Sequence, residues 1–226
     1  MTRVDPAAIL PHAVLALLDA ADADTLLRDA EGLADGLTDA GWTPEVESGR
    51  FGADGWDIVS SAWAPGLSAF LDGDVHEVRT AALAIAAALV DGGDRWSLDT
   101  EGPSWSAWSV EDPRWRTDEI DWLVWSGRGV VVSLYTAPEM AAGPGVLPAH
   151  LQLAISRADT PDEGLARDEA RDRRVAAEGS VVERWYLAGH EGLSDELLAR
   201  LEADDDGRVS AAAASERLLR DDSPRG

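Results

Sequence analysis

The stretch "EIDWLVWSGRGVVVSLYTAP", residues 119–138, has the alternating pattern of a β-hairpin. Residues 120–125 alternate between two faces, as in a half-buried strand. The glycines of "SGRG" allow a tight reversal, after which a β-branched run begins at Val130 and ends before Pro138. We therefore predict an antiparallel hairpin here, within an antiparallel sheet.

Two further segments bear on this sheet. "GWDIVSSAW", residues 55–63, alternates as a half-buried strand does. "PAHLQLAIS", residues 148–156, supports two interpretations, because its apolar residues alternate like those of a strand while Pro148 suits the start of a helix. The sequence leaves both interpretations of the second segment open.

Two helical patterns precede the hairpin. Leucines recur at helical spacing in "DADTLLRDAEGLADGLTDAGW", residues 22–42, and apolar residues do so in "GDVHEVRTAALAIAAALVDGG", residues 73–93. In the second segment Asp74 and Glu77 resemble a capping box, and a glycine pair ends the pattern. Helices beside a Trp-rich antiparallel sheet indicate an α+β fold.

The composition changes after Arg157, where charged and small residues dominate. We therefore predict an α+β domain over residues 1–157 and a helical region over residues 158–226. In the second region "LARDEARDRRVAA", which begins at Leu165, is echoed about 33 residues later by "LARLEADDDGRVSAA". Such a spacing is typical of stacked helical hairpins.

The segment "LAGHEGLSDELLARLEADDDGRVSAAAASERLL", residues 187–219, resembles the variant leucine-rich and HEAT-like helical repeats of bacteria. The resemblance implies a Leu-rich helix with Ser194 as N-cap, an Asp-rich turn, and an Ala-rich helix opened by "RV". Where such units often have Asn-Pro or His-Pro, this chain has His190–Glu191.

An acidic turn lies inside that segment, in "EADDDGRVSAAAASE", residues 202–216. As a calcium-binding EF-hand loop with Gly207 in sixth place, it would begin at Glu202 and end at Ala213. Ala213 lacks the carboxylate that supplies two oxygen ligands in such loops. We therefore predict a turn between two helices, with neither a metal nor a cofactor.

The charge limits the classes of partner. The chain has 43 acidic and 19 basic residues, every basic residue is an arginine, and the net charge at pH 7 is −24. Such a charge opposes contact with nucleic acid phosphates and favours a cationic partner. A GC-rich genome or adaptation to high salt would also give an acidic chain without lysine. With no long apolar run and no secretory signal, we expect a cytoplasmic bacterial protein that does not enter a membrane.

Ten tryptophans stand against two phenylalanines and two tyrosines. They either pack in the core or, where alternation turns them outward, anchor an interface. Alternation places Trp105 and Trp108 on opposite faces, and likewise Trp122 and Trp125. The predicted partner-binding residues combine these rings with the neighbouring acids: Trp105, Trp108, Trp122, Trp125, Asp118, Glu119 and Asp121.

From these features we expect a non-catalytic, acidic protein-binding module, such as an immunity or antitoxin-type protein that binds a basic partner. A structural or assembly component of a phage or particle is the first alternative. A second is an enzyme that uses the carboxylates of "TDEIDW", and a third is a sugar-binding module. The sequence contains no H-E-x-x-H, G-x-S-x-G or phosphate-loop motif, so we favour binding without catalysis.

Overall fold

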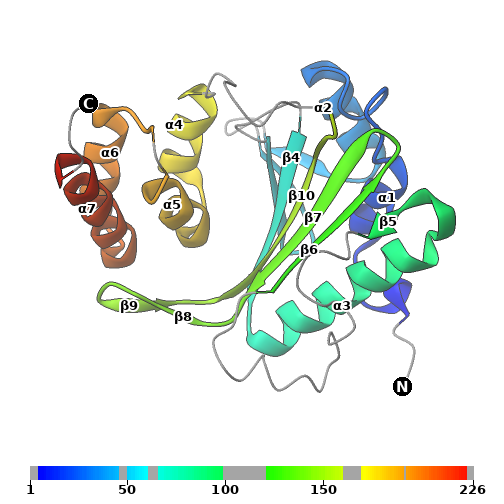
Figure 1. The fold of residues 1–226 in the computed structure, drawn as a ribbon, viewed down its shortest axis with the longest axis horizontal. Coiled ribbons are helices and arrows are strands. Elements are labelled where there is room, and N and C mark those ends of the chain that lie inside the picture. The colour runs from blue at the N-terminus through cyan, green and yellow to red at the C-terminus, as the bar shows by residue number, and fades with distance from the viewer. Residues whose placement is uncertain are drawn as a thin grey trace. The chain divides into compact units, whose positions relative to one another are not determined.

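A computed structural model describes residues 5–45, 50–60, 66–98, 121–159, 169–190 and 192–222 (Figure 1). The chain forms two compact units. The sheet unit comprises Met1–Pro138 and Ala149–Arg167, and the helical unit comprises Glu139–Pro148 and Asp168–Gly226. The predicted boundary after residue 157 stays a prediction.

The sheet unit contains an eight-stranded sheet in the order β1-β2-β3-β4-β10-β7-β6-β5, in which every pair of neighbours is antiparallel. The strands are β1 (Thr43–Glu45), β2 (Arg50–Ala53), β3 (Trp56–Ser60), β4 (Gly66–Gly73), β5 (Ser97–Leu98), β6 (Asp121–Gly127), β7 (Val130–Ala137) and β10 (Ala149–Arg157). With the helices described below, this confirms the predicted α+β class.

The predicted hairpin is present as β6 and β7. Trp125 lies opposite Val132, and the strands are joined by Arg128 and Gly129, whose φ angles are 51° and 74°. Positive φ at both central residues matches the right-handed twist of the flanking strands, which is why a glycine is favoured here. The segment from residue 149, for which the sequence left two interpretations open, is a strand.

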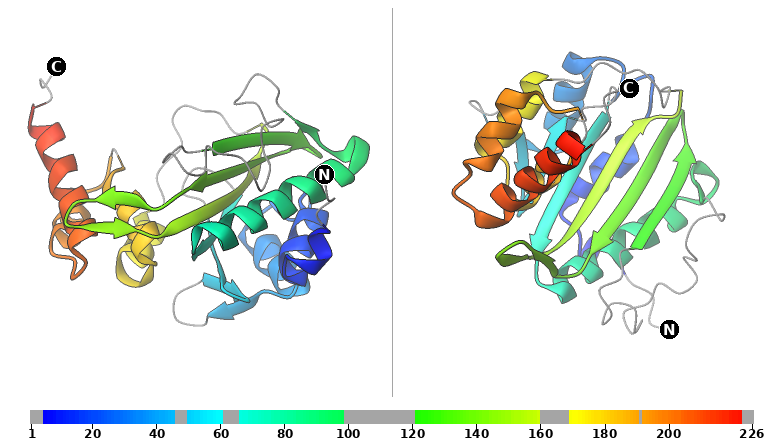
Figure 2. Two further views of the ribbon diagram at one scale, coloured as in Figure 1. Left: turned by 90° about the horizontal axis from the view of Figure 1, so that it is seen from below. Right: turned by 60° about the vertical axis from the view of Figure 1, so that its left-hand side comes forward.

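The helices of the sheet unit are η1 (Pro6–Ala8), α1 (His12–Ala20), α2 (Ala30–Asp39), α3 (Val75–Asp91) and η2 (Gly93–Arg95). The predicted capping box of α3 is present: Asp74 Oδ1 accepts hydrogen bonds from the amides of His76 and Glu77 at 2.7 and 3.0 Å, and Glu77 reaches back to the Asp74 amide. In Figure 2, α3 lies along one face of the sheet, and it contacts β4, β10 and β7.

The helix predicted within residues 22–42 is shorter than its pattern suggests. Asp22 accepts a hydrogen bond from the Asp24 amide at 2.8 Å, which holds the segment before Asp29 in turns. Asp29 accepts from the Gly32 amide at 2.7 Å and is the N-cap of α2. Aspartate side chains that bond to nearby amides compete with helical hydrogen bonds, so the leucines of this segment pack without a helix around them.

The core of the sheet unit lies on the face that α3 covers. Burial along β7 alternates residue by residue, and its inward residues join those of β10 and β6. Fully or almost fully buried residues in this core include Leu67, Ala69, Leu123, Trp125, Val132, Leu134, Leu151, Leu153 and Ile155 from the strands and Val78, Ala82, Ala84, Ile85 and Leu89 from α3. The alanines of α3 allow the helix to approach the sheet closely.

The helical unit contains α4 (Glu169–Glu178), α5 (Val181–Ala188), α6 (Asp195–Glu202) and α7 (Gly207–Asp222) with the hairpin β8 (Met140–Ala142) and β9 (Gly145–Leu147). Ser194 caps α6 by accepting from the Leu197 amide at 3.3 Å. The turn predicted between two helices is therefore present, and the resemblance to helical repeats stays a prediction.

The hairpin β8–β9 packs against α7 through glycines. A Cβ atom at Gly143, whose φ is 54°, would lie 2.6 Å from Ala211 Cβ, and one at Gly207 would lie 2.8 Å from Pro144 Cγ. The side chain of Arg208 also donates to the carbonyl oxygen of Val146. The segment Glu139–Pro148, which contains this hairpin, therefore belongs to the helical unit, although in the sequence it lies between β7 and β10 of the sheet unit.

Two buried tryptophans provide a test of the core. Trp42 is 1% exposed and its Nε1 donates to the Ala13 carbonyl oxygen at 3.1 Å. Trp125 is 2% exposed, and its Nε1 has no acceptor among the described residues. Trp42→Phe should lower the free energy of unfolding by about 0.5–1.5 kcal/mol more than Trp125→Phe, because only the first removes an existing hydrogen bond. Urea denaturation measures both, and equal losses would contradict this assignment.

Candidate functional site

The predicted partner-binding residues are only partly within the described chain. Trp105, Trp108, Asp118 and Glu119 lie outside it. Asp121 and Trp122 are the first residues of β6, and the structure describes their backbone. Trp125 lies in the core with 2% of its surface exposed, so this ring presents no surface to a partner.

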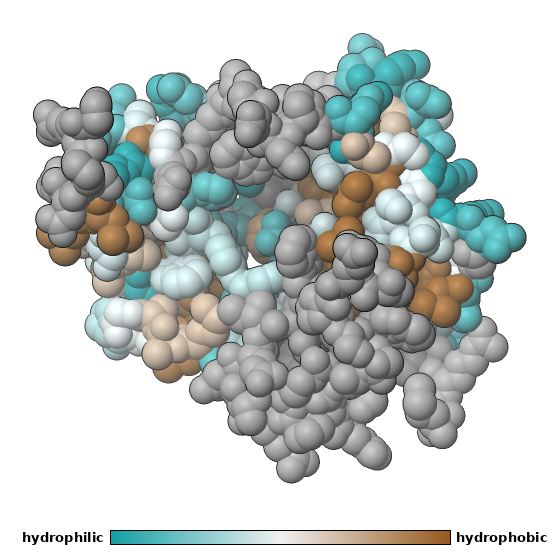
Figure 3. All heavy atoms as spheres, viewed as in Figure 1, coloured by the Kyte–Doolittle hydropathy of each residue, from teal (hydrophilic) through white to brown (hydrophobic). Residues whose placement is uncertain are grey.

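Acidic residues are concentrated in the segment from the end of α1 to the end of α2, which we call the acidic layer (residues 19–39). It contains one basic residue, Arg28. Its acids are Asp19, Asp22, Asp24, Asp29, Glu31, Asp35 and Asp39. Figure 3 shows mainly hydrophilic side chains over α2, in the upper right of the view.

Three arginines of the sheet unit, from η2, the β6–β7 turn and the end of β10, hold the first part of the acidic layer. Arg95 Nη1 lies 3.1 Å from Asp19 Oδ1, and Arg128 Nη1 donates to the Asp19 carbonyl oxygen at 2.7 Å. Arg157 Nη1 donates to the carbonyl oxygen of Ala23 at 3.1 Å. These contacts attach the acidic layer to the edge of the core.

The second part of the acidic layer is different. Glu31, Asp35 and Asp39 lie four residues apart on α2, so they share one helix face, and all three are exposed. Within the described chain none of them forms an ion pair. We call these three residues the α2 acidic stripe.

The α2 acidic stripe lowers the stability of its own helix. Like charges four residues apart destabilise a helix by about 0.2–0.5 kcal/mol per pair. Asp39 also stands in the last turn, where the helix dipole is negative and where α2 has no basic residue. A cationic group placed against this face would relieve both effects.

A groove runs beside the stripe, between α1 and α2, with a volume of about 430 Å³. Its floor is made of small residues, and Asp35 and Asp39 stand in its lining. A Cβ atom at Gly36 would lie 2.8 Å from Leu26 Cδ1, so a larger residue here would require the Leu26 side chain to move. The groove and the stripe together present carboxylates beside a shallow apolar surface.

The acidic turn of the helical unit has a structural role. Arg184 Nε lies 2.8 Å from Asp204 Oδ2, and Arg208 Nη2 lies 2.6 Å from Asp206 Oδ2. Arg217 pairs with Glu202 in the same way. These arginines occupy the carboxylates that a calcium ion would need, and the described residues contain no group of three or more His, Cys, Asp or Glu side chains arranged to hold a metal.

No protein-family model, no curated protein and no solved structure matches this chain. In the described part of the chain, no helix combines the length and the apolar character needed to cross a membrane. The function is therefore inferred from the chemistry of the site alone.

Asp206 gives the helical unit a defined response to pH. Its hydrogen bond with the Arg208 side chain lowers the pKa of Asp206 from 3.8 to about 2, and the Arg208 amide acts in the same direction. A lowered pKa in the folded state means that the stabilisation is complete above the unfolded pKa of 3.8 and is lost as the pH falls towards 2.

Asp206→Asn keeps an oxygen that can cap α7 and removes the charge. At pH 7 the wild-type helical unit should be more stable than this variant by on the order of 1–2 kcal/mol, and the difference should disappear between pH 4 and pH 2. Urea titrations followed by NMR signals of the helical unit measure it. A difference that is the same at pH 2 and pH 7 would contradict this role.

Proposed function

We propose that the protein is a non-catalytic, acidic binding module whose sheet unit captures a basic protein through the α2 acidic stripe. A neutralising partner of a basic protein, of the immunity or antitoxin type, is the class that fits best, and its proposed setting is the bacterial cytoplasm. The observation that carries the proposal is the exposed stripe of Glu31, Asp35 and Asp39, which pairs with no described residue.

The positions of these carboxylates support the proposal. Some acids elsewhere in the described chain, such as Asp19 and Asp204, lie against arginines, while others, such as Asp94 and Asp205, are exposed without one. On α2 three acids that pair with no described residue repel one another along one face, and Asp39 in the last turn also opposes the helix dipole, whereas Glu31 in the first turn is favoured by it. Local features that oppose stability are expected mainly at functional sites.

The net charge also favours a basic partner, because it raises the rate of association with such proteins. A charge of −24 creates a long-range negative potential that attracts basic proteins and speeds their association. The stripe would then give the encounter a defined place to form ion pairs. Genome composition or salt adaptation would raise the number of acids along the whole chain, whereas the stripe places three of them on one exposed helix face.

We propose binding without catalysis because the stripe is exposed on a helix surface. General acid–base chemistry needs carboxylates in a site that excludes water and positions a substrate. Exposed carboxylates in water instead suit reversible, salt-sensitive association.

The triple variant Glu31→Gln/Asp35→Asn/Asp39→Asn tests the proposal. We expect the wild-type protein to retain a basic protein from native lysate at about 150 mM salt. The affinity for that purified protein, measured by calorimetry, should fall at least tenfold in the variant. The variant itself should be as stable as the wild type or more so, because its like-charge repulsion is gone.

A matched control removes three exposed acids elsewhere: Asp94→Asn/Glu139→Gln/Asp205→Asn. It should bind nearly as the wild type does. Equal losses in the two variants would show that only total charge matters. A chain that retains no basic protein, and that forms large assemblies alone in light scattering, would overturn the proposal in favour of an assembly component.

A further inference from the structure

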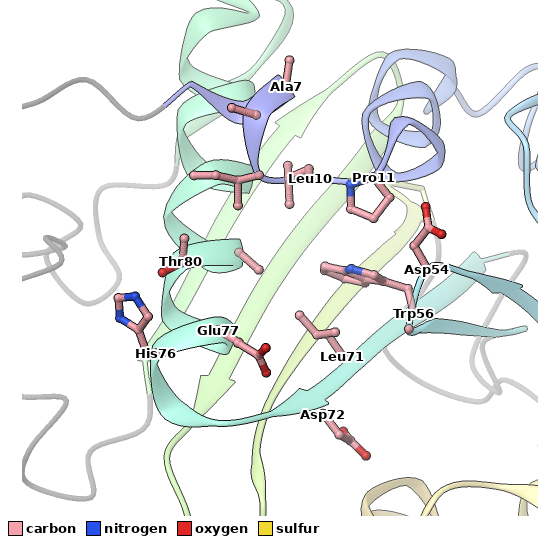
Figure 4. A pocket seen from close by; sticks show the side chains of 14 residues that line it. Ala7, Leu10, Pro11, Asp54, Trp56, Leu71, Asp72, His76, Glu77 and Thr80 are labelled. Carbon is pink, nitrogen blue, oxygen red and sulfur yellow. The ribbon is translucent and has the colours of Figure 1, made fainter.

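The sheet unit contains a pocket of about 710 Å³ at one end of α3 (Figure 4). Four segments line it: residues 7–11 around the end of η1, residues 54–56 at the start of β3, residues 71–72 at the end of β4, and residues 76–81 of α3. Its volume falls within the range of about 300–1,000 Å³ that is typical of ligand sites.

The wall of the pocket is apolar. Ile9 is 39% exposed and forms the accessible part of this wall together with the half-buried Pro11 and Leu71. Leu10 and Trp56 lie behind it, 5% and 3% exposed, and Leu71 lies opposite Trp56 on the neighbouring strand. A ligand with an aliphatic part would therefore remove apolar surface from water on entering.

Carboxylates supply the charge of the pocket. In Figure 4 the Glu77 carboxylate points from α3 towards the Trp56 ring and Leu71, and Asp54 stands on the other side of that ring. The lining contains no Lys or Arg, and besides these two carboxylates it contains Asp72 and His76. With three carboxylates and one imidazole, the pocket favours a cation over an anion.

The two carboxylates are held to different degrees. Asp54 and Gly55 form the turn before β3 with φ angles of 47° and 85°, and the exposed Asp54 lines the pocket. Glu77 Oε2 accepts from the Asp74 amide at 3.4 Å, which holds this carboxylate before a ligand binds. A group that is already held in place loses little entropy when a cation arrives.

We propose that this pocket receives the side chain of an arginine: an aliphatic stem against Ile9, Pro11 and Leu71, and a guanidinium attracted by the carboxylates of Asp54 and Glu77. Arginine buries its methylene groups along apolar surfaces and donates paired hydrogen bonds to carboxylates. The assignment of this arginine to a basic protein partner rests on the proposed function. The affinity of the pocket for a guanidinium does not.

The probe for the pocket is agmatine, which carries a guanidinium and an ammonium on a four-carbon chain, with N-carbamoylputrescine as the analogue that keeps the ammonium and replaces the guanidinium by a neutral urea. We expect agmatine to shift the NMR signal of the Trp56 indole N–H, assigned with Trp56→Phe, and N-carbamoylputrescine to bind at least tenfold more weakly. Asp54→Asn/Glu77→Gln should weaken agmatine binding at least tenfold. Gln can keep the hydrogen bond to the Asp74 amide and Asn tolerates positive φ, so both the helix cap and the turn should survive.

The control variant Asp94→Asn/Asp205→Asn removes the same number of charges from exposed positions. It should bind agmatine as the wild type does. A Trp56 signal that does not move with agmatine, or equal binding by the two double variants, would overturn the assignment of the pocket.

A second experiment, the affinity of the captured basic protein for the same variants, identifies the source of the guanidinium. If the captured basic protein loses at least tenfold in affinity for Asp54→Asn/Glu77→Gln but not for the control, the arginine belongs to that partner. If agmatine binds while the affinity for the partner is unchanged, the pocket is a site for a free small cation and the partner assignment is wrong. If agmatine binds and no basic protein is found, the proposed function fails and the cation pocket stands.

Discussion

Strand β10 is the constraint on which the sheet unit depends. It pairs with β4 on one side and β7 on the other along nearly its whole length, and its inward residues Leu151, Leu153 and Ile155 are fully buried. A shift of one residue would turn these side chains to the opposite face, so the register is strongly determined. Because Leu71 lies opposite Leu151 and Trp56 lies opposite Leu71, the same register positions the wall of the cation pocket.

Arginine use separates structural from available acids in this chain. Where a carboxylate lies beside an arginine, as Asp206 does beside Arg208, it fixes a helix end or a loop. The α2 acidic stripe and the pocket carboxylate Asp54 stand apart from the described arginines, and both belong to the sheet unit. A single basic partner that contacts both would combine a broad electrostatic surface with one specific side-chain contact.

Short-range patterns predicted the hairpin β6–β7, the capping box of α3 and the turn after α6, because each depends on neighbours in the sequence. The start of α2 was misplaced because Asp22 and Asp29 form side-chain hydrogen bonds that periodicity does not register. The sequence did not lead us to predict a site at Glu31, Asp35 and Asp39, although their four-residue spacing on a helical pattern places them on one face. The pocket was not predicted either, since it joins four segments whose approach depends on strand pairing.

If the α2 acidic stripe meets a basic protein, the complex must cover its carboxylates. Carbodiimide labelling of carboxylates with and without the captured partner, followed by mass spectrometry, measures this protection. We expect labelling of Glu31, Asp35 and Asp39 to fall several-fold in the complex, while labelling of exposed acids such as Asp205 does not change. Unchanged labelling of the stripe, with protection of acids in the helical unit instead, would contradict this role of the stripe.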